Sequence, residues 1–396
     1  MAKLEFKDIS FKEMDNKVRV TFLKIFYFDL DKSELKKIAD FGVADSSITF
    51  KGISDDKARR KLNILLDRGF EELTNKVTNK RTVYIHQNST IPLIGNVSFG
   101  IVDRNSSLIE LKPITSCNID CIYCSVDQNK RLVDFVVEKD YLVKELKKLI
   151  EFKGISNIEA HIGTQGEPFL YADIVDLIRD ISEIKQVKTI SIDTNGTFLT
   201  KHLVDKLAEA GLTRFKLSIN AVEPKLARKI ANCPYDIKKI MDICKYIVKK
   251  TGLMITPVLI PGINEAEIEK IIKFAKEIKA DLGIQNFLNY KFGKNPVKEA
   301  SFDKFYEILG NLEKKHNVKL IKSEQDFNII KTKELPKPFR KGDVIRADIA
   351  CPGRLKNEKI AVSSNRTISV PNCYKIGSVR LKITRDKHNI FVGTIV

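Results

Sequence analysis

The segment ITSCNIDCIYCSVDQ, residues 114–128, holds three of the chain's seven cysteines: Cys117, Cys121 and Cys124. It directly follows an apolar, strand-like run (108–113), so we expect the three thiols on a loop after a strand. Thiolate is the soft ligand that iron–sulfur clusters require, and this spacing lets three thiolates reach three corners of a [4Fe–4S] cube. No fourth cysteine follows nearby. One iron is therefore expected to remain open to an exchangeable ligand.

Two other interpretations of the same cysteines stay open at this point. A structural zinc site needs a fourth Cys or His to complete its tetrahedron, and none is close in sequence. The other alternative is that the cysteines are small core residues, but Asn118, Asp120 and Ser125 make the loop polar. Clustered cysteines in a chain without a secretory signature point to metal or redox chemistry rather than to disulfides.

Outward from this loop, residues 107–317 alternate β-branched apolar runs with helical patterns, which is typical of βα units around a parallel sheet. The expected strands are Leu108–Pro113, Ile158–Ile162, Thr189–Asp193, Arg214–Ile219, Met254–Leu259 and Gly283–Phe287. Helices are expected at 139–154, ending at Gly154, and at 263–280, with Asn264 as N-cap and Glu267 completing a capping box. Six such units predict an α/β fold, a partial (βα)6 barrel or open curved sheet, with its chemistry at the carboxyl ends of the strands.

The flanking regions have different patterns. Residues 1–105 combine strand-like segments with two helical ones and predict a small N-terminal α+β domain without a catalytic signature. Residues 106–330 form the predicted core. After a basic, proline-punctuated linker, residues 338–396 show short β-rich segments with Gly and Asn turns, which predict a small all-β barrel of TRAM or OB type.

The cysteine motif and the βα repeats together resemble the radical S-adenosylmethionine (SAM) superfamily over about residues 106–317. The resemblance implies that the open iron binds the methionine end of SAM. An electron, supplied by a ferredoxin- or flavodoxin-type donor, then cleaves SAM to methionine and a 5′-deoxyadenosyl radical, which takes hydrogen from the substrate. The cofactors implied are thus a [4Fe–4S] cluster and SAM.

The resemblance also assigns SAM contacts at successive strand ends. In GTQGEP (163–168), Gly166 and Glu167 match the family's Gly-Gly-Glu-Pro segment, and Glu167 would bind the SAM ammonium; as an acid before a helix it also suits a helix start. The remaining candidates are Tyr123 beside the cluster, Thr194 and Asn195 at the ribose, Ser218 and Asn220 at the ribose or carboxylate, Ile260 and Pro261 against adenine, and Gln285 with Asn286 at the barrel mouth.

Charge suggests the partner. The chain has 69 Lys and Arg against 51 Asp and Glu, a formal charge of +18, and residues 338–396 alone carry twelve against four. This last region resembles a TRAM domain, an RNA-binding barrel, in Lys341-Gly342-Asp343, in Gly377 and in the closing NIFVG. Its expected phosphate contacts are Arg346, Arg354, Lys356, Arg366, Lys375, Arg380, Lys382 and Arg385. RNA is therefore the expected substrate, and tRNA is the leading candidate among RNAs.

The reaction itself stays open. Radical SAM cores with TRAM domains resemble tRNA methylthiotransferases, but residues 1–116 contain no cysteine for a second cluster. No catalytic residue is assigned. Cys351 and Cys373 are candidates as a pair, as auxiliary ligands or as methyl carriers, while burial as small hydrophobic residues is the alternative for them and for Cys233 and Cys244. His161 is either a satisfied buried histidine or a proton donor.

Two rival functions remain: a radical SAM enzyme acting on a protein, peptide or small metabolite, and a non-enzymatic RNA-binding metalloprotein. Removing residues 338–396 is expected to abolish RNA binding and to leave SAM cleavage intact if RNA is the substrate. No stretch is apolar enough to span a membrane and the charged amino terminus has no signal-peptide core, so a cytoplasmic protein is expected. The Lys- and Ile-rich, Trp-free composition suits an anaerobic archaeon.

Overall fold

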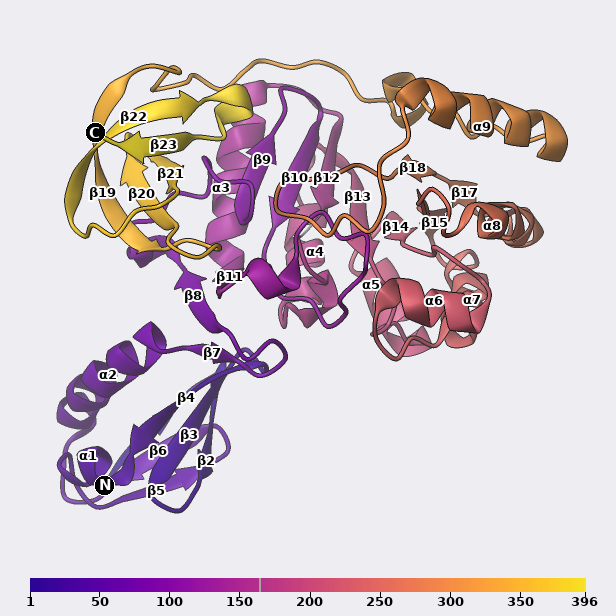
Figure 1. Cartoon of the computed structure of the whole chain (residues 1–396). Coiled ribbons are helices and arrows are strands. Elements are labelled where there is room, and N and C mark those ends of the chain that lie inside the picture. Colours follow the sequence, from indigo (N-terminus) through magenta and orange to yellow (C-terminus); the bar gives the residue numbers. More distant parts are fainter. Residues whose placement is uncertain (164) are drawn as a thin grey trace.

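The computed structural model describes residues 1–163 and 165–396, and its centre is a seven-stranded sheet in the order β17-β15-β14-β13-β12-β10-β9. Helices pack along this sheet, while two smaller parts of the chain lie to one side of it (Figure 1). The core strands are β9 (Gly100–Asp103), β10 (Leu108–Lys112), β12 (Ile158–Ile162), β13 (Val187–Thr194), β14 (Arg214–Leu217), β15 (Gly252–Ile255) and β17 (Asp281–Leu282). The core helices are α3 (Lys139–Lys153), α4 (Ile174–Ser182), α5 (Lys201–Glu209), α6 (Pro224–Ala231), α7 (Ile237–Ile247), α8 (Glu265–Ile278) and α9 (Phe302–His316).

Six of these strands pair in parallel, from β10 to β17, which confirms the predicted α/β partial barrel. The seventh, β9, joins antiparallel to β10, so the core sheet reaches back before residue 105. The strand predicted at Met254–Leu259 is divided at Pro257, since proline interrupts a ladder. The sixth strand of the sheet, β17, lies just before the range predicted for it, Gly283–Phe287. A separate parallel pair, β16 (Val258–Leu259) with β18 (Gln285–Asn286), continues beyond the break.

The helix boundaries follow local signals with one exception. Helix α3 ends at Gly154, whose φ of 65° is the left-handed conformation that glycine adopts freely. Helix α8 begins after Asn264, but the predicted capping box is wrong. The Glu267 carboxylate instead accepts hydrogen bonds from the backbone N–H groups of Val222 and Glu223, at 2.7 and 2.9 Å. Glu267 therefore fixes the loop that follows β14.

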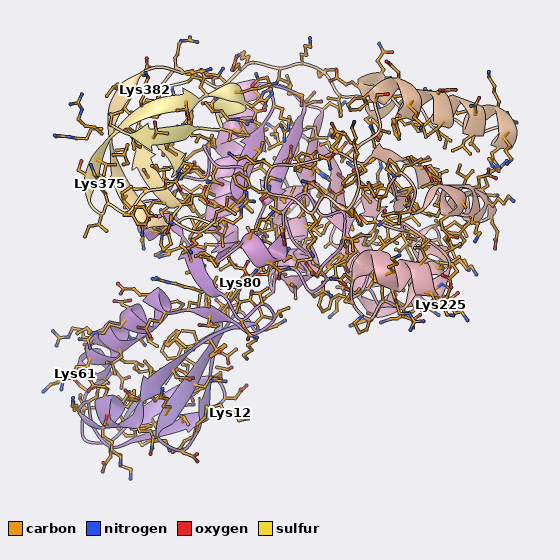
Figure 2. The ribbon with its side chains drawn as sticks, in the orientation of Figure 1. Lys12, Lys61, Lys80, Lys225, Lys375 and Lys382 are labelled. Carbon is orange, nitrogen blue, oxygen red and sulfur yellow. The ribbon has the colours of Figure 1, made fainter. Side chains whose placement is uncertain are left out.

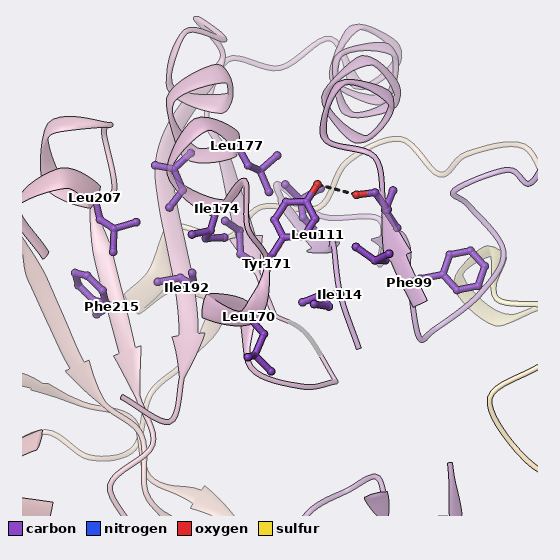
Figure 3. Packing of buried hydrophobic residues seen from close by; sticks show 14 of the residues in the cluster. Phe99, Leu111, Ile114, Leu170, Tyr171, Ile174, Leu177, Ile192, Leu207 and Phe215 are labelled. Carbon is purple, nitrogen blue, oxygen red and sulfur yellow. Dashed lines mark hydrogen bonds between the residues drawn. The ribbon is translucent and has the colours of Figure 1, made fainter. Parts of the chain in front are cut away.

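Apolar side chains between the sheet and its helices form the main core (Figure 3). Leu111 and Ile192 on the sheet face Ile174 and Leu177 on α4, and all four are at most 4% exposed. The buried phenol of Tyr171 donates to the Val137 carbonyl at 2.7 Å, so its polar end is satisfied. Burial of such side chains stabilises the fold by about 1.5–3 kcal/mol each.

The N-terminal part is an α+β unit, as expected, and is connected to the core through β7 and β8 (Figure 1). A three-stranded sheet, β1-β6-β5, lies beside a six-stranded sheet, β11-β8-β7-β4-β3-β2. The second sheet includes β11 of the core, which pairs in parallel with β8. The elements are β1 (Ala2–Glu5), β2 (Ile9–Glu13), β3 (Lys17–Phe22), β4 (Phe26–Asp31), α1 (Lys32–Lys36), β5 (Phe41–Ala44), β6 (Ser47–Phe50), α2 (Asp55–Glu71), β7 (Thr74–Asn75), β8 (Arg81–Ile85) and β11 (Val133–Val137).

The C-terminal part is a closed barrel in the order β19-β20-β21-β23-β22, which confirms the predicted small all-β barrel. Its strands are β19 (Val344–Pro352), β20 (Lys359–Ser363), β21 (Arg366–Val370), β22 (Ser378–Arg385) and β23 (Val392–Ile395). The segment before β9 holds it in place, because Thr367 and Phe391 donate backbone hydrogen bonds to the carbonyls of Ile94 and Gly95. A side chain at Gly95 would meet the Thr367 carbonyl at 2.1 Å, so the two chains touch there.

Lysines are spread over all three parts of the molecule, with Lys61 on the N-terminal unit, Lys225 on α6 and Lys382 on the barrel (Figure 2). The surface is thus basic overall rather than at a single point. Among the described residues, no helix combines the length and the apolar character needed to cross a bilayer.

Candidate functional site

The three-cysteine loop leaves the carboxyl end of β10 and is fixed at its root by buried polar contacts. Asp134, fully buried, accepts from Ser116 at 3.2 Å and from Thr115 at 3.3 Å. The amide of Asn75, also fully buried, donates to Ser116 at 2.6 Å and to Asp134 at 3.1 Å. The N-terminal unit therefore helps to set where the cysteines begin, a role that sequence reasoning missed.

Beyond this root, Cys117, Cys121 and Cys124 are partly buried and none is in a disulfide. Burial raises the pKa of all three thiols, that of Cys117 to about 12. A bound metal reverses this effect, because coordination deprotonates a thiol outright. The positive charge of the Arg131 guanidinium partly offsets this rise in pKa at Cys117 and Cys124. Arg131 is 1% exposed, and its Nε has no partner among the described residues.

This arrangement fits an anionic iron–sulfur cluster, whose charge would compensate Arg131. Within residues 1–163 and 165–396, no three His, Cys, Asp or Glu side chains form a group that could hold one metal ion. Three thiols without a fourth Cys or His close in sequence are the donor set of a [4Fe–4S] cluster with one open iron.

Glu167 connects the loop after β12 to the end of β13. Its carboxylate is 1% exposed and accepts from Thr194 Oγ1 and from the Asn195 N–H, both at 2.8 Å. The carboxylate also accepts from the Phe169 N–H at 3.2 Å. Glu167 is thus the N-cap of the 3-10 helix η3 (Pro168–Leu170), as expected for an acid before a helix. Burial raises the pKa of Glu167 to about 7.

Gly166 has a steric reason to be glycine. A Cβ there would lie 2.2 Å from the Ser116 carbonyl oxygen, and the neighbouring Glu167 N–H donates to that same oxygen at 2.7 Å. The loop after β12 therefore packs directly on the cysteine loop. Thr164, also in this segment, lies outside the described residues.

Four of the predicted SAM contacts gather around Cys121. Tyr123, Asn195, Ser218 and Asn220 line the same small cavity of about 20 Å³ as that cysteine. The Asn220 amide donates to the Tyr123 hydroxyl at 2.8 Å, and Asn195 donates to Asn118 of the cysteine loop at 3.0 Å. Tyr235, which sequence reasoning missed, donates to the Asn195 carbonyl at 2.9 Å and closes this group.

Other predicted residues are less central. Ile260 is fully buried, with its N–H donating to Asn264 Oδ1 at 2.7 Å. Gln285 is exposed and lines a different cavity, of about 260 Å³, beside Thr256 and Phe305. The structure thus does not bring Gln285 to the cysteines, and Asn286 donates to the Ala300 carbonyl at 3.0 Å.

The scattered cysteines lie among apolar side chains. Cys373 belongs to the core of the C-terminal barrel, whereas Cys351 packs against the main core, and both are free thiols. Neither lines the large cavity described next. Cys244 is fully buried in α7. The structure favours the interpretation of these three as small hydrophobic residues, and it gives no pairing of Cys351 with Cys373.

A cavity of about 860 Å³ lies between the inner face of the sheet and the C-terminal barrel. On the sheet side, His161 is held by Ser191 at 2.8 Å and by Asp193 at 3.1 Å, so it is a satisfied histidine that nevertheless lines the cavity. The cavity also reaches Ser125, next to Cys124, and Gln165, next to Gly166. It therefore connects directly to the cysteine loop.

Arg354 of the barrel connects the two sides of this cavity. Its guanidinium donates to the side chain of Gln165, and its carbonyl accepts from the Leu132 N–H at 2.9 Å. It is 8% exposed, and burial, with Arg131 nearby, lowers its pKa to about 10. Arg354, one of the expected phosphate contacts, therefore lies between the barrel and the core and not on the outer face of the barrel. Arg366, another of these expected contacts, donates to Asn389 and two carbonyls.

A three-thiol loop at the strand ends of a parallel partial barrel defines an α/β enzyme that carries an iron–sulfur cluster. Residues 111–275 match the profile described as "Radical SAM superfamily". Over 371 residues the chain is 38% identical to "Uncharacterized protein MJ0103" of Methanocaldococcus jannaschii, and the match covers 85% of each protein. The chain therefore contains a radical SAM superfamily domain, and its cofactors are a [4Fe–4S] cluster and SAM.

Other similarities are partial. The GTP 3′,8-cyclase of Listeria welshimeri is 30% identical over 192 residues, which are 47% of this chain and 55% of the cyclase. The crystal structure of Streptococcus suis SuiB bound to S-adenosylmethionine aligns with a TM-score of 0.45 at 15% identity, over 79% of this chain and 70% of SuiB. The cyclase comparison thus concerns about half of each protein.

Proposed function

We propose that this radical SAM enzyme modifies RNA, with tRNA as the first candidate. The observation that carries the proposal is an exposed like-charged pair on the C-terminal barrel. Arg346 on β19 and Arg380 on β22 are direct cross-strand partners, and both are exposed. Like charges facing each other across strands are unfavourable unless a polyanion neutralises them.

The same barrel carries further exposed cationic and aromatic side chains. Lys382 lies one pleat beyond Arg380, and Figure 2 draws it and Lys375 directed away from the molecule. Neighbouring Tyr374 and Ile376 are 75% and 84% exposed, which gives RNA bases an aromatic surface next to the charge. Within residues 1–163 and 165–396, Arg346, Arg380 and Lys382 make no ion pair. A TRAM-like RNA-binding role fits these features.

The cofactor contacts are also proposed. When bound, the reduced cluster and SAM supply a 5′-deoxyadenosyl radical, with the electron coming from a ferredoxin- or flavodoxin-type donor. Cys117, Cys121 and Cys124 hold the cluster, and Glu167 holds the SAM ammonium. Tyr123, Thr194, Asn195, Ser218 and Asn220 orient the rest of SAM, and Ile260 supplies an apolar surface. No residue is assigned to the hydrogen-abstraction step.

The raised pKa of Glu167 leads to a prediction of how SAM affinity depends on pH. Its folded pKa of about 7 lies above the ordinary glutamate value of 4.5, so the folded protein retains the proton to a higher pH than the unfolded chain. Protein stability therefore falls as pH rises from about 4.5 to 7, whereas the ionised form needed for the ammonium accumulates. We expect SAM to bind about tenfold more weakly at pH 6 than at pH 8. Equilibrium titration of Glu167→Gln should give weak binding with that pH dependence removed; an unchanged profile would contradict the role.

The RNA proposal is tested with the full chain, because the barrel packs on the core and its removal would also remove Arg354. We expect Arg346→Ala with Arg380→Ala to weaken tRNA binding at least tenfold and to lower the slope of log affinity against log salt by about two. Lys225→Ala on α6 is the control, being exposed and remote from the barrel (Figure 2). Equal salt slopes in all three proteins would refute RNA binding by this face.

A second candidate substrate is a free nucleotide. The similarity to a GTP 3′,8-cyclase favours it, since that relative's name gives GTP as its substrate. Mass spectrometry separates the two candidates: a nucleoside missing from the tRNA of a deletion strain supports RNA, whereas conversion of free GTP by the reduced enzyme supports the alternative.

A further inference from the structure

The large cavity between the sheet and the C-terminal barrel has an unbalanced charge. Its cationic side chains outnumber the carboxylates Glu110, Asp193 and Glu358 two to one: Arg104, Lys112, Lys291, Arg354, Lys356 and Arg385. Arg104 and Lys112 share Glu110, at 2.7 and 3.0 Å. The other four make no ion pair with any described residue. The cavity thus provides positive charge that the protein itself does not neutralise.

Arg354 gives the clearest sign of a missing partner. It is more than nine-tenths buried, lines the cavity, and its Nε has no hydrogen-bond partner among the described residues. Leaving a buried guanidinium donor unsatisfied costs several kcal/mol, so such groups are normally paired. The Nε atom itself is shielded from the cavity, but an anionic group there would offset the guanidinium charge, and the planar guanidinium matches phosphate oxygens.

The rest of the lining fits the non-phosphate part of a nucleotide. Tyr290 and Phe292, 48% and 40% exposed, border the cavity on either side of Lys291, whose ammonium lies 5.2 Å from the Phe292 ring centre. Exposed aromatic rings beside cations are the surfaces on which bases stack. On the sheet side, the Asp193 carboxylate, which His161 holds through one oxygen, offers its other oxygen to a base edge or a ribose.

The volume and the position agree with a substrate site. About 860 Å³ falls within the range of sites that enclose small ligands, and one wall is the segment carrying Ser125 and Val126, which follows Cys124. The opposite wall is the barrel, with Lys356 and Arg385 facing in. A ligand whose phosphate is held at the barrel wall would extend across the cavity toward the wall beside the cysteine loop, from which the radical must arrive.

We propose that this cavity binds a phosphorylated nucleoside, with its phosphate on Arg354, Lys356 and Arg385 and its base beside Tyr290 and Phe292. The inference deepens the proposed function and rests on its radical chemistry. The barrel then has two separate roles, since its outer face carries Arg346 and Arg380 while its inner wall is part of the active site. The phosphorylated nucleoside is either one residue of a bound RNA or a free nucleotide.

The first experiment uses anaerobic, SAM-loaded full-length protein with the four nucleoside 5′-monophosphates and the matching nucleosides as probes. We expect a monophosphate to bind at least tenfold more tightly than its nucleoside, since hydrogen bonds to charged groups contribute about 1.5–3 kcal/mol. Lys356→Ala and Arg385→Ala should each remove most of that preference. Lys225→Ala on α6, which is exposed and outside the cavity, should leave it intact.

The second experiment uses tRNA from a deletion strain and measures binding and single-turnover modification separately. If the substrate is RNA, the two cavity variants should lower the modification rate at least tenfold while tRNA affinity changes less than twofold, the reverse of Arg346→Ala with Arg380→Ala. If tRNA neither binds nor reacts but monophosphates bind through Lys356 and Arg385, the RNA proposal fails and the cavity inference stands. If the cavity variants change neither monophosphate binding nor tRNA modification, the inference is wrong.

Discussion

Cys121→Ala is expected to abolish the cluster and, with it, all reductive cleavage of SAM. The substitution removes the middle of three thiolates from a site in which Cys117 and Cys124 alone cannot hold a four-iron cube. The iron content of the anaerobically reconstituted protein should fall from about four irons per chain to a small remainder, and its visible iron–sulfur absorption should disappear. Mutating a residue that only contacts a metal ligand already lowers metal affinity or activity by about 10–100-fold. Loss of a ligand itself should therefore lower the rate of SAM cleavage by more than about 100-fold.

The matched control is Cys233→Ala, which removes a partly exposed thiol close to the same loop. Full iron content and full SAM cleavage in this variant would show that three cysteines suffice and that one iron is open. If Cys233→Ala lost its iron as Cys121→Ala does, the cluster would have four thiolate ligands and the account of an open iron would fail. Circular dichroism of both variants checks that they remain folded.

Gly166→Ala is expected to have the second-largest effect, although it adds a single methyl group. That methyl would lie 2.2 Å from the Ser116 carbonyl and 2.5 Å from that of Thr115, and both are backbone atoms that cannot rotate away. The loop carrying Glu167 must therefore move relative to the cysteine loop. A displacement of about 1 Å can cost about 100-fold in rate, and overpacking of this kind costs about 1–3 kcal/mol of stability.

Measurements of SAM affinity and cleavage rate test this prediction, with thermal unfolding alongside them. Gly310→Ala in α9 is the control, because nothing lies within 4 Å of a Cβ there. It should leave SAM binding unchanged and raise stability slightly, since alanine is the better helix former. Gly166→Ala with wild-type SAM affinity would contradict the close packing of the two loops.

Features encoded locally in the sequence were predictable. The spacing of Cys117, Cys121 and Cys124 needs only eight residues, and the order of βα units follows from alternating apolar patterns. Gly154 ends α3 because the left-handed conformation is a single-residue property. These signals sufficed for the α/β class, the six parallel strands and the family.

Features that depend on distant contacts were not predictable. Asn75 lies 41 residues before Ser116, and only the folded chain brings them within 2.6 Å. Glu267 has the spacing of a capping box with Asn264, yet the loop after β14 offers its carboxylate two better-placed N–H donors. A sequence pattern states which local bond is available, not which tertiary bond competes with it.

The positions of the charged side chains in the C-terminal region could not be predicted from the sequence. Arg354 and Arg380 are both arginines in short strand-rich segments, and nothing in the sequence separates them. The structure places Arg380 on the outer face and Arg354 between the barrel and the core, where it contacts Gln165. Burial of a charge is a tertiary property, so the contribution of the barrel to the cavity could not be foreseen.

The central claim is that a cluster on these three cysteines leaves one iron open for SAM. The most direct measurement is the products formed when anaerobic, reconstituted protein is reduced with dithionite in the presence of SAM. The account predicts methionine and 5′-deoxyadenosine in equal amounts, formed by the wild-type chain and not by Cys121→Ala. Zinc in place of iron in protein purified without oxygen, with SAM recovered intact after reduction, would contradict it.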